Sequence, residues 1–341
     1  MWGPDAVAAV LFVALCVYVL TGGADFGGGV LDLLASGPRR SAQRRVIARA
    51  IGPIWEANHV WLILVIVLLF TCFPKGFALI GTALHWPLTL LLIGVVLRGT
   101  AFVFRTYDSR REDIQARWSW VFSLASVFAP VMLGVSTGAV ASGALTVDAA
   151  GVYTGGWVEP WLAPFPLATG AFTLALFTLL AAVYLLVDTE DAELREDFRT
   201  RALQAAGAVF VTAWMAYFAA LRGAPLLAAG LLGSPLALVM QGLTALLGVA
   251  LVGAIARRRY RIARGLAVVQ VVALLAGWGA NQWPWLVVGT LTVEQAAAPE
   301  GVLWGTLAVL GTGAPALIAA YVWMIRVFRR QKLSGAPGVP H

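Results

Sequence analysis

Residues 52–73, GPIWEANHVWLILVIVLLFTCF, form a long apolar run in which Glu56 is the only charged residue. A membrane-spanning helix needs about 20 consecutive, mainly apolar residues, so this stretch is long enough to cross a bilayer. The chain therefore reads as an all-α polytopic membrane protein of about nine transmembrane helices. The apolar runs lie at 5–34, 52–73, 77–104, 118–141, 164–187, 202–221, 225–256, 264–281 and 301–327.

The composition excludes the other common classes of protein. Of the 341 residues, 60% are hydrophobic and 12% are charged, and the mean hydropathy is +0.84. A soluble domain carries about 25% charged residues, and a disordered chain combines low hydrophobicity with high charge. The unbroken apolar runs argue against a membrane β-barrel, whose strands alternate. We expect one transmembrane domain over 1–341, with approximate halves 1–141 and 164–281 and an extra helix at 301–327.

The basic residues predict the orientation of the chain in the membrane. The net charge is +7, but the Lys and Arg residues sit in short clusters between apolar runs, and no basic domain could lie along nucleic acid. The alternate loops hold only Lys75 and Arg222. The positive-inside rule then places the N-terminus outside and the C-terminus in the cytoplasm. The clusters fall at 35–50, 105–117, 188–201, 256–264 and 326–332.

Two smaller features concern the first spans. No Lys or Arg precedes Arg39, so the first run lacks the positive segment of a cleaved signal peptide, and we expect it to stay as a helix. Cys16 and Cys72 fall at different depths of their own spans. Because bridged Cα atoms lie within about 7 Å of each other, a disulfide between them is not expected.

A compact set of ionisable residues lies at membrane depth in the first third of the chain. Such residues are costly in a bilayer and are functional candidates by default. Glu56 follows Arg49 by seven residues, as Arg98 precedes Arg105 by seven, so both are expected about 10 Å inside the membrane. The complete set is Asp25, Asp32, Glu56, His59 and Arg98.

Two interpretations of this set stay open. Arg98 could neutralise Glu56 in a structural ion pair, because a lone buried charge costs several kcal/mol. Alternatively, the set could form a proton path from the cytoplasm, as ionisable chains in membranes often do. No basic residue is expected at the depth of Asp25, which would favour a protonated carboxyl and suit a relay.

The glycines at Gly22, Gly23 and Gly27–Gly29 surround Asp25. Small residues allow membrane helices to approach closely, so packing is one interpretation. Room for a ligand or for another subunit's helix is the other. The segment has no Lys-Ser/Thr ending and no preceding strand, so it is not a phosphate loop.

The remaining polar features have simpler explanations. His59 and His85 could be axial haem ligands or ordinary core histidines, and the sequence shows no spacing typical of a metal cluster. The charged segment 188–201 is expected to be a solvated helix end with i,i+4 ion pairs. Arg257–Arg264 is expected to contact lipid headgroups. The tryptophans of the two longer outer connections, 142–163 and 282–300, are expected to anchor at the interface.

Two motifs together resemble a known family. The first is the Gly22–Gly29 segment GGADFGGG, and the second is the Ile51–Ile63 segment IGPIWEANHVWLI, which includes Trp55, Asn58 and Trp61. They resemble subunit II of the cytochrome bd-type quinol oxidases. Arg98 with Phe102–Arg105, the segment Arg117–Trp120, and Tyr153-Thr154-Gly155 are further matches. The resemblance covers nearly the whole chain, but its strong motifs all precede residue 166.

The resemblance implies a fold of two four-helix bundles plus one peripheral helix, and membership of a heterodimer in the bacterial cytoplasmic (inner) membrane. The partner would be subunit I, which would carry haem b with haem d, or b-type haem only. This chain would bind no haem or metal itself, would support the haem subunit, and would contribute to a cytoplasmic proton path for quinol oxidation by dioxygen. Whether it also holds a structural quinone or a small accessory subunit is left open.

Residue by residue, the resemblance assigns roles at three positions. Glu56 matches the family's acidic residue after Trp, Arg98 its arginine, and Asp25 its first-span aspartate. Some members have a further aspartate where this chain has Val103, so the resemblance implies an altered proton route here, with Asp32 as a substitute. The same resemblance argues against His59 and His85 as haem ligands.

Two other functions compete with this one. Buried carboxylates and glycine-broken helices also occur in secondary ion-coupled transporters. A b-type cytochrome anchor would use His59 and His85 as haem ligands. Haem bound to the isolated chain would favour the anchor, and ion-dependent solute uptake without a redox partner would favour the transporter.

Overall fold

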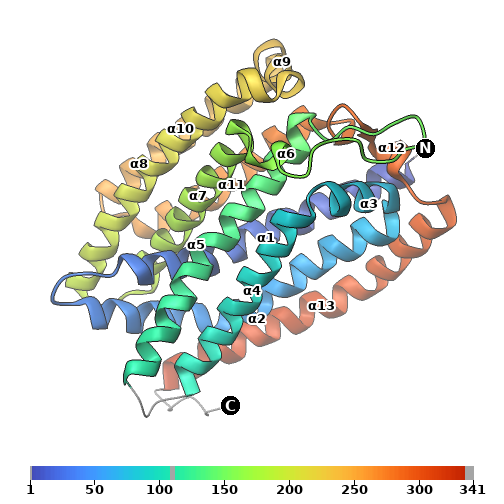
Figure 1. Ribbon diagram of the computed structural model, residues 1–341. Coiled ribbons are helices and arrows are strands. Elements are labelled where there is room, and N and C mark those ends of the chain that lie inside the picture. The colour runs from blue at the N-terminus through green and yellow to red at the C-terminus, as the bar shows by residue number, and fades with distance from the viewer. Residues whose placement is uncertain (1, 108–111, 335–341) are drawn as a thin grey trace.

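The computed structural model describes residues 2–107 and 112–334, with side chains described for all of these except 52–57, 105–107, 112–116, 321 and 324–334. Most of the described chain is helical (Figure 1). The helices are α1 (Gly3–Leu34), α2 (Arg40–Cys72), α3 (Pro74–Ala83), α4 (His85–Tyr107), α5 (Glu112–Ser142), α6 (Glu159–Leu162), α7 (Pro164–Asp188), α8 (Ala192–Gly223), α9 (Pro225–Gly233), α10 (Pro235–Ala256), α11 (Tyr260–Gln282), α12 (Val293–Ala296) and α13 (Glu300–Ser334), and the strands are β1 (Trp285–Val287) and β2 (Leu291–Thr292).

Eight helices in the described residues are long and apolar enough to cross a membrane. A ninth span is obtained if the end of α2, Asn58–Cys72, is counted together with α3, which bends away from it by 115°. These numbers confirm the prediction of an all-α polytopic membrane protein. They also agree with the nine apolar runs in the sequence.

The helices pack around a continuous core. Helix α1 contacts α2, α5 and α7, and α5 also contacts α4 and α7. Helix α7 contacts α8 and α11, and α10 pairs with α11. One core cluster extends from Tyr18 in α1 to Val271 in α11. Helix α13 lies on the outside beside α2 (Figure 1), as expected for a peripheral helix.

Two of the expected helices are divided. The run 77–104 was expected as one helix, but it is split between α3 and α4 at Leu84. The run 225–256 is split between α9 and α10 at Ser234, and Pro235 is the first residue of α10. Proline lacks an N–H group and is favoured in the first turn of a helix, so Pro235 starts a new helix within apolar sequence. Hydropathy alone does not reveal either break.

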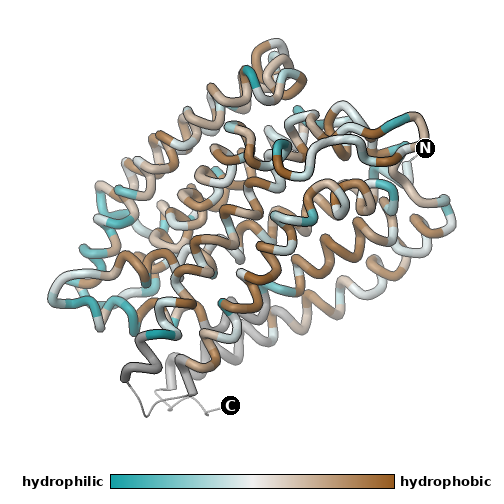
Figure 2. Tube along the Cα trace, viewed as in Figure 1, coloured by the Kyte–Doolittle hydropathy of each residue, from teal (hydrophilic) through white to brown (hydrophobic). Residues whose placement is uncertain are grey.

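Figure 2 shows apolar residues along the bodies of the helices and hydrophilic residues gathered at the loops and helix ends. The β1–β2 hairpin, α6 and α12 lie at the end that holds the start of α1, and the C-terminal end of α13 lies opposite (Figure 1). The hairpin pairs Trp285 with Thr292 in antiparallel register. Cys16 and Cys72 are both buried and free, as the sequence predicted.

Candidate functional site

The glycines of α1 bring three neighbouring helices against its backbone. A Cβ on Gly27 would collide with the backbone carbonyl oxygen of Phe177 in α7, and one on Gly29 with the Ser126 side chain in α5. A Cβ on Gly28 would lie 2.6 Å from Ile51 Cδ1 in α2. Small residues at such crossings let helix backbones approach closely. The packing interpretation of these glycines is therefore confirmed, and Asp25 lies where α1 meets its neighbours.

Arg98 reaches from α4 to α1 and holds the carboxylate of Asp25 with both ends of its guanidinium group. Nη1 donates to Oδ2 over 2.7 Å, and Nη2 donates to Oδ1 over 2.6 Å. Nη2 also donates to the backbone carbonyl of Asp25 over 2.9 Å, and Nε donates to Ser126 Oγ over 2.8 Å. Arg98 is 1% exposed and Asp25 is fully buried. Two-pronged pairs of this kind are among the strongest and most directional hydrogen-bonded pairs.

Two aromatic rings enclose the Arg98 guanidinium group. Its Cζ atom lies 4.8 Å from the ring centre of Phe26 and 4.9 Å from that of Phe122. Cation–π contacts at this distance stabilise a cation, and more so when it is removed from water. The pair ties α1, α4 and α5 together and is almost completely buried.

This geometry corrects the sequence-based expectation for Asp25 and Arg98. Asp25 was expected to have no basic residue at its depth, yet Arg98 is its partner. The expected depth of Asp25 assumed an unbroken helix from Asp25 to Arg39 with a constant rise per residue, but α1 ends at Leu34. It also neglected the length of the arginine side chain, which extends well beyond its own Cα. Asp25 therefore has a basic partner at its own depth.

Asp32 is the second buried carboxylate of α1. It is fully buried, and Ser123 Oγ in α5 donates to its Oδ2 atom over 3.2 Å. Arg44 Nε lies 3.6 Å from the same oxygen and donates to the Asp32 backbone carbonyl over 3.3 Å. The Arg44 side chain is 26% exposed, so Asp32 is adjacent to a group that reaches the surface. Asp32 lies two helical turns, about 10 Å, from Asp25.

The other predicted site residues lie on α2 and α4. Glu56 and Trp55 fall outside the described side chains, so the predicted Glu56–Arg98 contact is not described and the role of Glu56 stays a prediction. His59 is half-buried on α2, and Trp61 packs against the main core. Val103 is exposed on α4, at the position where some relatives are expected to carry an aspartate.

Several polar residues beside the ion pair were missed by sequence reasoning. Asn58 Oδ1 accepts a hydrogen bond from Thr21 Oγ1 over 3.1 Å. Its Nδ2 atom and the Tyr18 hydroxyl are buried and have no hydrogen-bond partner among the residues that the structure describes. Asn58 was recognised only as part of a motif, and Tyr18 gave no signal at all. Ser126 was also missed, because hydroxyls in membrane helices commonly bond their own helix, as Ser126 does with Phe122.

His85 lies at the first residue of α4, outside this site. Its Nδ1 atom lies 3.0 Å from the Thr82 carbonyl oxygen. Its ring centre lies 5.1 Å from each of the rings of Trp86 and Trp157. Trp157 belongs to the longer outer connection. Within the residues that the structure describes, no three His, Cys, Asp or Glu side chains gather as a metal site would require.

Ion pairs join the two halves of the chain at the end opposite the β-hairpin. Arg39 donates to Asp197 through Nη2 over 2.6 Å and to Glu193 through Nη1 over 3.0 Å. The bond with Asp197 raises the pKa of the Arg39 guanidinium above its ordinary value, so Arg39 stays protonated. Segment 188–201 was expected to pair mainly within its own helix. That expectation is wrong for Glu193 and Asp197, because loop 35–39 brings Arg39 beside them.

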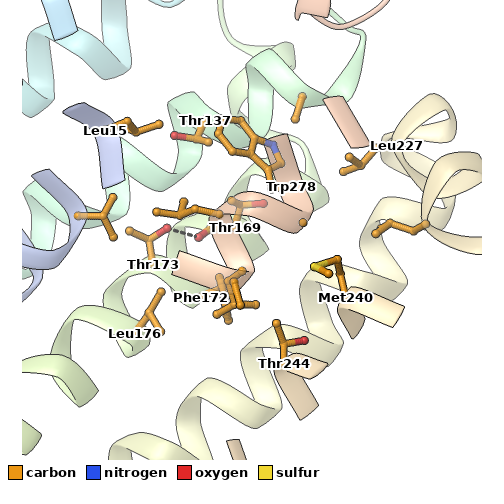
Figure 3. A pocket seen from close by; sticks show the side chains of 18 of the residues that line it. Leu15, Thr137, Thr169, Phe172, Thr173, Leu176, Leu227, Met240, Thr244 and Trp278 are labelled. Atoms are coloured by element: carbon orange, nitrogen blue, oxygen red, sulfur yellow. Dashed lines mark hydrogen bonds between the residues drawn. The ribbon is translucent and has the colours of Figure 1, made fainter. Parts of the chain in front are cut away.

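An apolar chamber of about 290 Å³ lies between α1, α5, α7, α10 and α11 (Figure 3). The Thr137, Thr169 and Thr173 hydroxyls, which line it, each donate to a carbonyl of their own helix. They therefore offer mainly methyl groups to the space. Among the described residues that line the chamber there is no histidine or cysteine, and the sulfur comes from Met240. This lining does not fit a haem with histidine ligation.

The fold and the site define a polytopic helical membrane protein with a charged pair buried between its first helices. The chain belongs to the family of cytochrome bd terminal oxidase subunit II, which matches residues 4–328. That match confirms the resemblance seen in the sequence and leaves the transporter hypothesis without support. The two motifs around Asp25 and Glu56 both lie inside the matched region.

Individual relatives agree with the family assignment. The chain is 33% identical over 129 residues to cytochrome bd ubiquinol oxidase subunit 2 of Bacillus subtilis (strain 168), covering 38% of this chain and 36% of that protein. It is 30% identical over 182 residues to cytochrome bd-I ubiquinol oxidase subunit 2 of Escherichia coli (strain K12), covering 52% and 46%. The matched stretches thus span between a third and a half of these relatives.

A solved structure shares the fold over almost the whole chain. It is a chain of the bd oxidase from Geobacillus thermodenitrificans, with a TM-score of 0.80 and 21% sequence identity. The superposition covers 96% of this chain and 99% of that one. At this identity the likeness shows a shared fold.

Proposed function

We propose that this chain is the subunit II, without haem, of a cytochrome bd-type quinol:dioxygen oxidoreductase. The observation that carries the proposal is the family match over residues 4–328. The shared fold with a chain of a bd oxidase supports it. In this role the chain supports the haem-bearing subunit and contributes to proton uptake.

The haems belong to the partner, subunit I, in this proposal. When bound there, they supply the electron transfer from quinol and the reduction of dioxygen. The chamber lining described above contains no histidine or cysteine, which supports the assignment of haem to the partner. The complex is then a heterodimer in the bacterial cytoplasmic membrane. The basic segments that meet through Arg39 and Arg258 would face the cytoplasm by the positive-inside rule.

Asp32 is the residue that we propose as a proton carrier in this chain. It is buried, yet it lies beside the partly exposed Arg44. Its hydrogen bond from Ser123 gives it a fixed position against α5. In this proposal, Glu56 and His59, which lie on the adjacent helix α2, continue the proton path beyond Asp32. Asp25 and Arg98 act as a fixed neutral pair that positions these helices.

The test is to purify the tagged full-length chain in mild detergent with whatever accompanies it. We expect a larger haem-bearing partner and rapid oxygen uptake on addition of a reduced quinol. An absorption spectrum of the complex and of the separated chains would assign the haems. Absence of any haem-bearing partner in native membranes would overturn the proposal, as would haem that remains on this chain alone.

A further inference from the structure

We propose that the turn between α10 and α11 binds the headgroup of an anionic phospholipid. The turn and the first residues of α11 carry the exposed arginines Arg257, Arg258, Arg259 and Arg261 within five residues. It connects two apolar membrane-length helices, so these side chains lie at the level of the lipid headgroups. Each Lys or Arg near such a surface adds about 1 kcal/mol, or roughly fivefold, to the attraction for anionic lipid.

The turn does not use most of these charges for its own folding. The carbonyls at the end of α10 are bound by Arg199 of α8, whose Nε donates to Ile255 and whose Nη2 donates to Ala256. The backbone N–H groups of Arg258 and Arg259 bond Ile255 and Ala254. The orphan carbonyls of a helix end are thereby satisfied without the arginine side chains of the turn.

Within the part of the chain that the structure describes, three of the four arginines have no acidic partner. Glu196 pairs with both Arg199 and Arg258. Arg257, Arg259 and Arg261 make no ion pair or side-chain hydrogen bond with any residue that the structure describes. Three exposed guanidinium groups without counter-charges are thus left close together. A phosphate bearing a negative charge is the ligand that such groups bind best.

The backbone of the turn suggests that its arginines are there for their side chains. Arg258 has φ +60°, a left-handed conformation that favours glycine. Glycine at this point would end α10 in the usual way. The chain instead carries an arginine, which keeps the basic residues contiguous and pairs with Glu196.

An apolar track for the lipid tail begins at the same place. By helical spacing, Leu246, Val249, Gly253 and Arg257 share one face of α10. Val249 is 73% exposed and Leu246 is 66% exposed. Arg257 Nη1 lies 3.3 Å from the position of a Cβ on Gly253, so its guanidinium group rests at the top of this face. Eleven residues of helix span about 16 Å, close to the half-thickness of the hydrocarbon core.

The site combines three exposed guanidinium groups with an exposed aliphatic face of α10 that is about as long as one leaflet is thick. This combination fits a phospholipid better than a soluble anion. The proposed ligand is therefore a membrane phospholipid with a net negative headgroup. A free phosphate would use only the arginines and gain nothing from Val249 or Leu246.

The test places the purified complex in nanodiscs of phosphatidylcholine with or without phosphatidylglycerol. Phosphatidylglycerol retained by the complex is counted by native mass spectrometry after release into mild detergent. In R257Q/R259Q/R261Q we expect the apparent affinity for phosphatidylglycerol to fall on the order of 100-fold. The matched control removes three exposed arginines of α2 in R40Q/R45Q/R49Q and should retain the lipid.

Further variants and a competition with inorganic phosphate test whether the site is specific for the lipid. R257K/R259K/R261K preserves the charge and should retain phosphatidylglycerol, and R261Q alone should weaken it by about fivefold. Equal loss in the α2 control would overturn the proposal, since it would show general surface charge only. Full displacement by inorganic phosphate would also overturn it, because a soluble anion would then account for the site. Unchanged retention in R257Q/R259Q/R261Q would do the same.

Discussion

Arg98 and Asp25 lie 73 residues apart in the sequence, yet Arg98 donates hydrogen bonds to both carboxylate oxygens of Asp25 within the membrane core of the protein. Both side chains are almost completely buried. Since an unpaired charge at this depth carries a large free-energy cost, each residue lowers the cost of burying the other. The pair therefore has a structural role. Asp32, the other buried carboxylate of α1, lies beside the partly exposed Arg44 and so is nearer the surface.

The first prediction concerns the stability of the pair. Arg98→Gln leaves the Asp25 carboxylate buried without a counter-charge and should destabilise the fold by about 3–5 kcal/mol. The measurement is the yield of assembled complex and its thermal unfolding in detergent. Asp25→Asn combined with Arg98→Gln removes both charges and should recover part of the loss. Equal loss in the single and double variants would contradict the ion-pair account.

The second prediction concerns Asp32 as a proton carrier. Asp32→Asn keeps the size of the side chain and the contact with Ser123 but removes the titratable group. We expect assembly and haem content to be unchanged while quinol oxidation slows on the order of 10²-fold. Asp188→Asn, which alters an exposed carboxyl at the end of α7, serves as the control. Wild-type turnover in Asp32→Asn would exclude Asp32 from the path.

The third prediction concerns Glu56, whose side chain is outside the described set. Glu56→Gln should slow proton-coupled turnover and leave assembly intact, because the amide is close in shape but cannot release a proton at neutral pH. Oxygen uptake and proton release by the reconstituted complex would be measured together. Unchanged activity would remove Glu56 from the relay.

The fourth prediction tests the close approach of α1 and α7. Gly27→Ala places a Cβ against the backbone carbonyl of Phe177, which cannot move aside as a flexible side chain can. Overpacking of this kind typically costs about 1–3 kcal/mol, so the unfolding temperature should fall. Gly81→Ala in α3 meets nothing within 4 Å and should leave it unchanged or slightly higher. Matching unfolding temperatures for both variants would argue against tight packing at Gly27.

Much of the site could be recognised in the sequence, but its pairings could not. Asp25, Asp32 and Arg98 stood out because charges are rare in apolar runs. Asp25 was nevertheless not foreseen as the partner of Arg98, because depth along a helix says nothing about which face a side chain occupies or how far it reaches. Tyr18 and Asn58 each have a buried polar atom without a partner among the described residues. Nothing in the sequence indicated this, because their burial depends on neighbouring helices.

Long apolar runs have no stable placement outside a membrane, so the sequence pattern alone identifies a polytopic helical membrane protein, and the motifs identify the family. The hydropathy pattern does not show that the runs 77–104 and 225–256 break at Leu84 and Ser234. The pairing of Arg98 with Asp25 and of Arg39 with Asp197 became visible only in the folded chain. Those contacts depend on helix rotation and crossing, which packing at residues such as Gly27 and Gly29 sets.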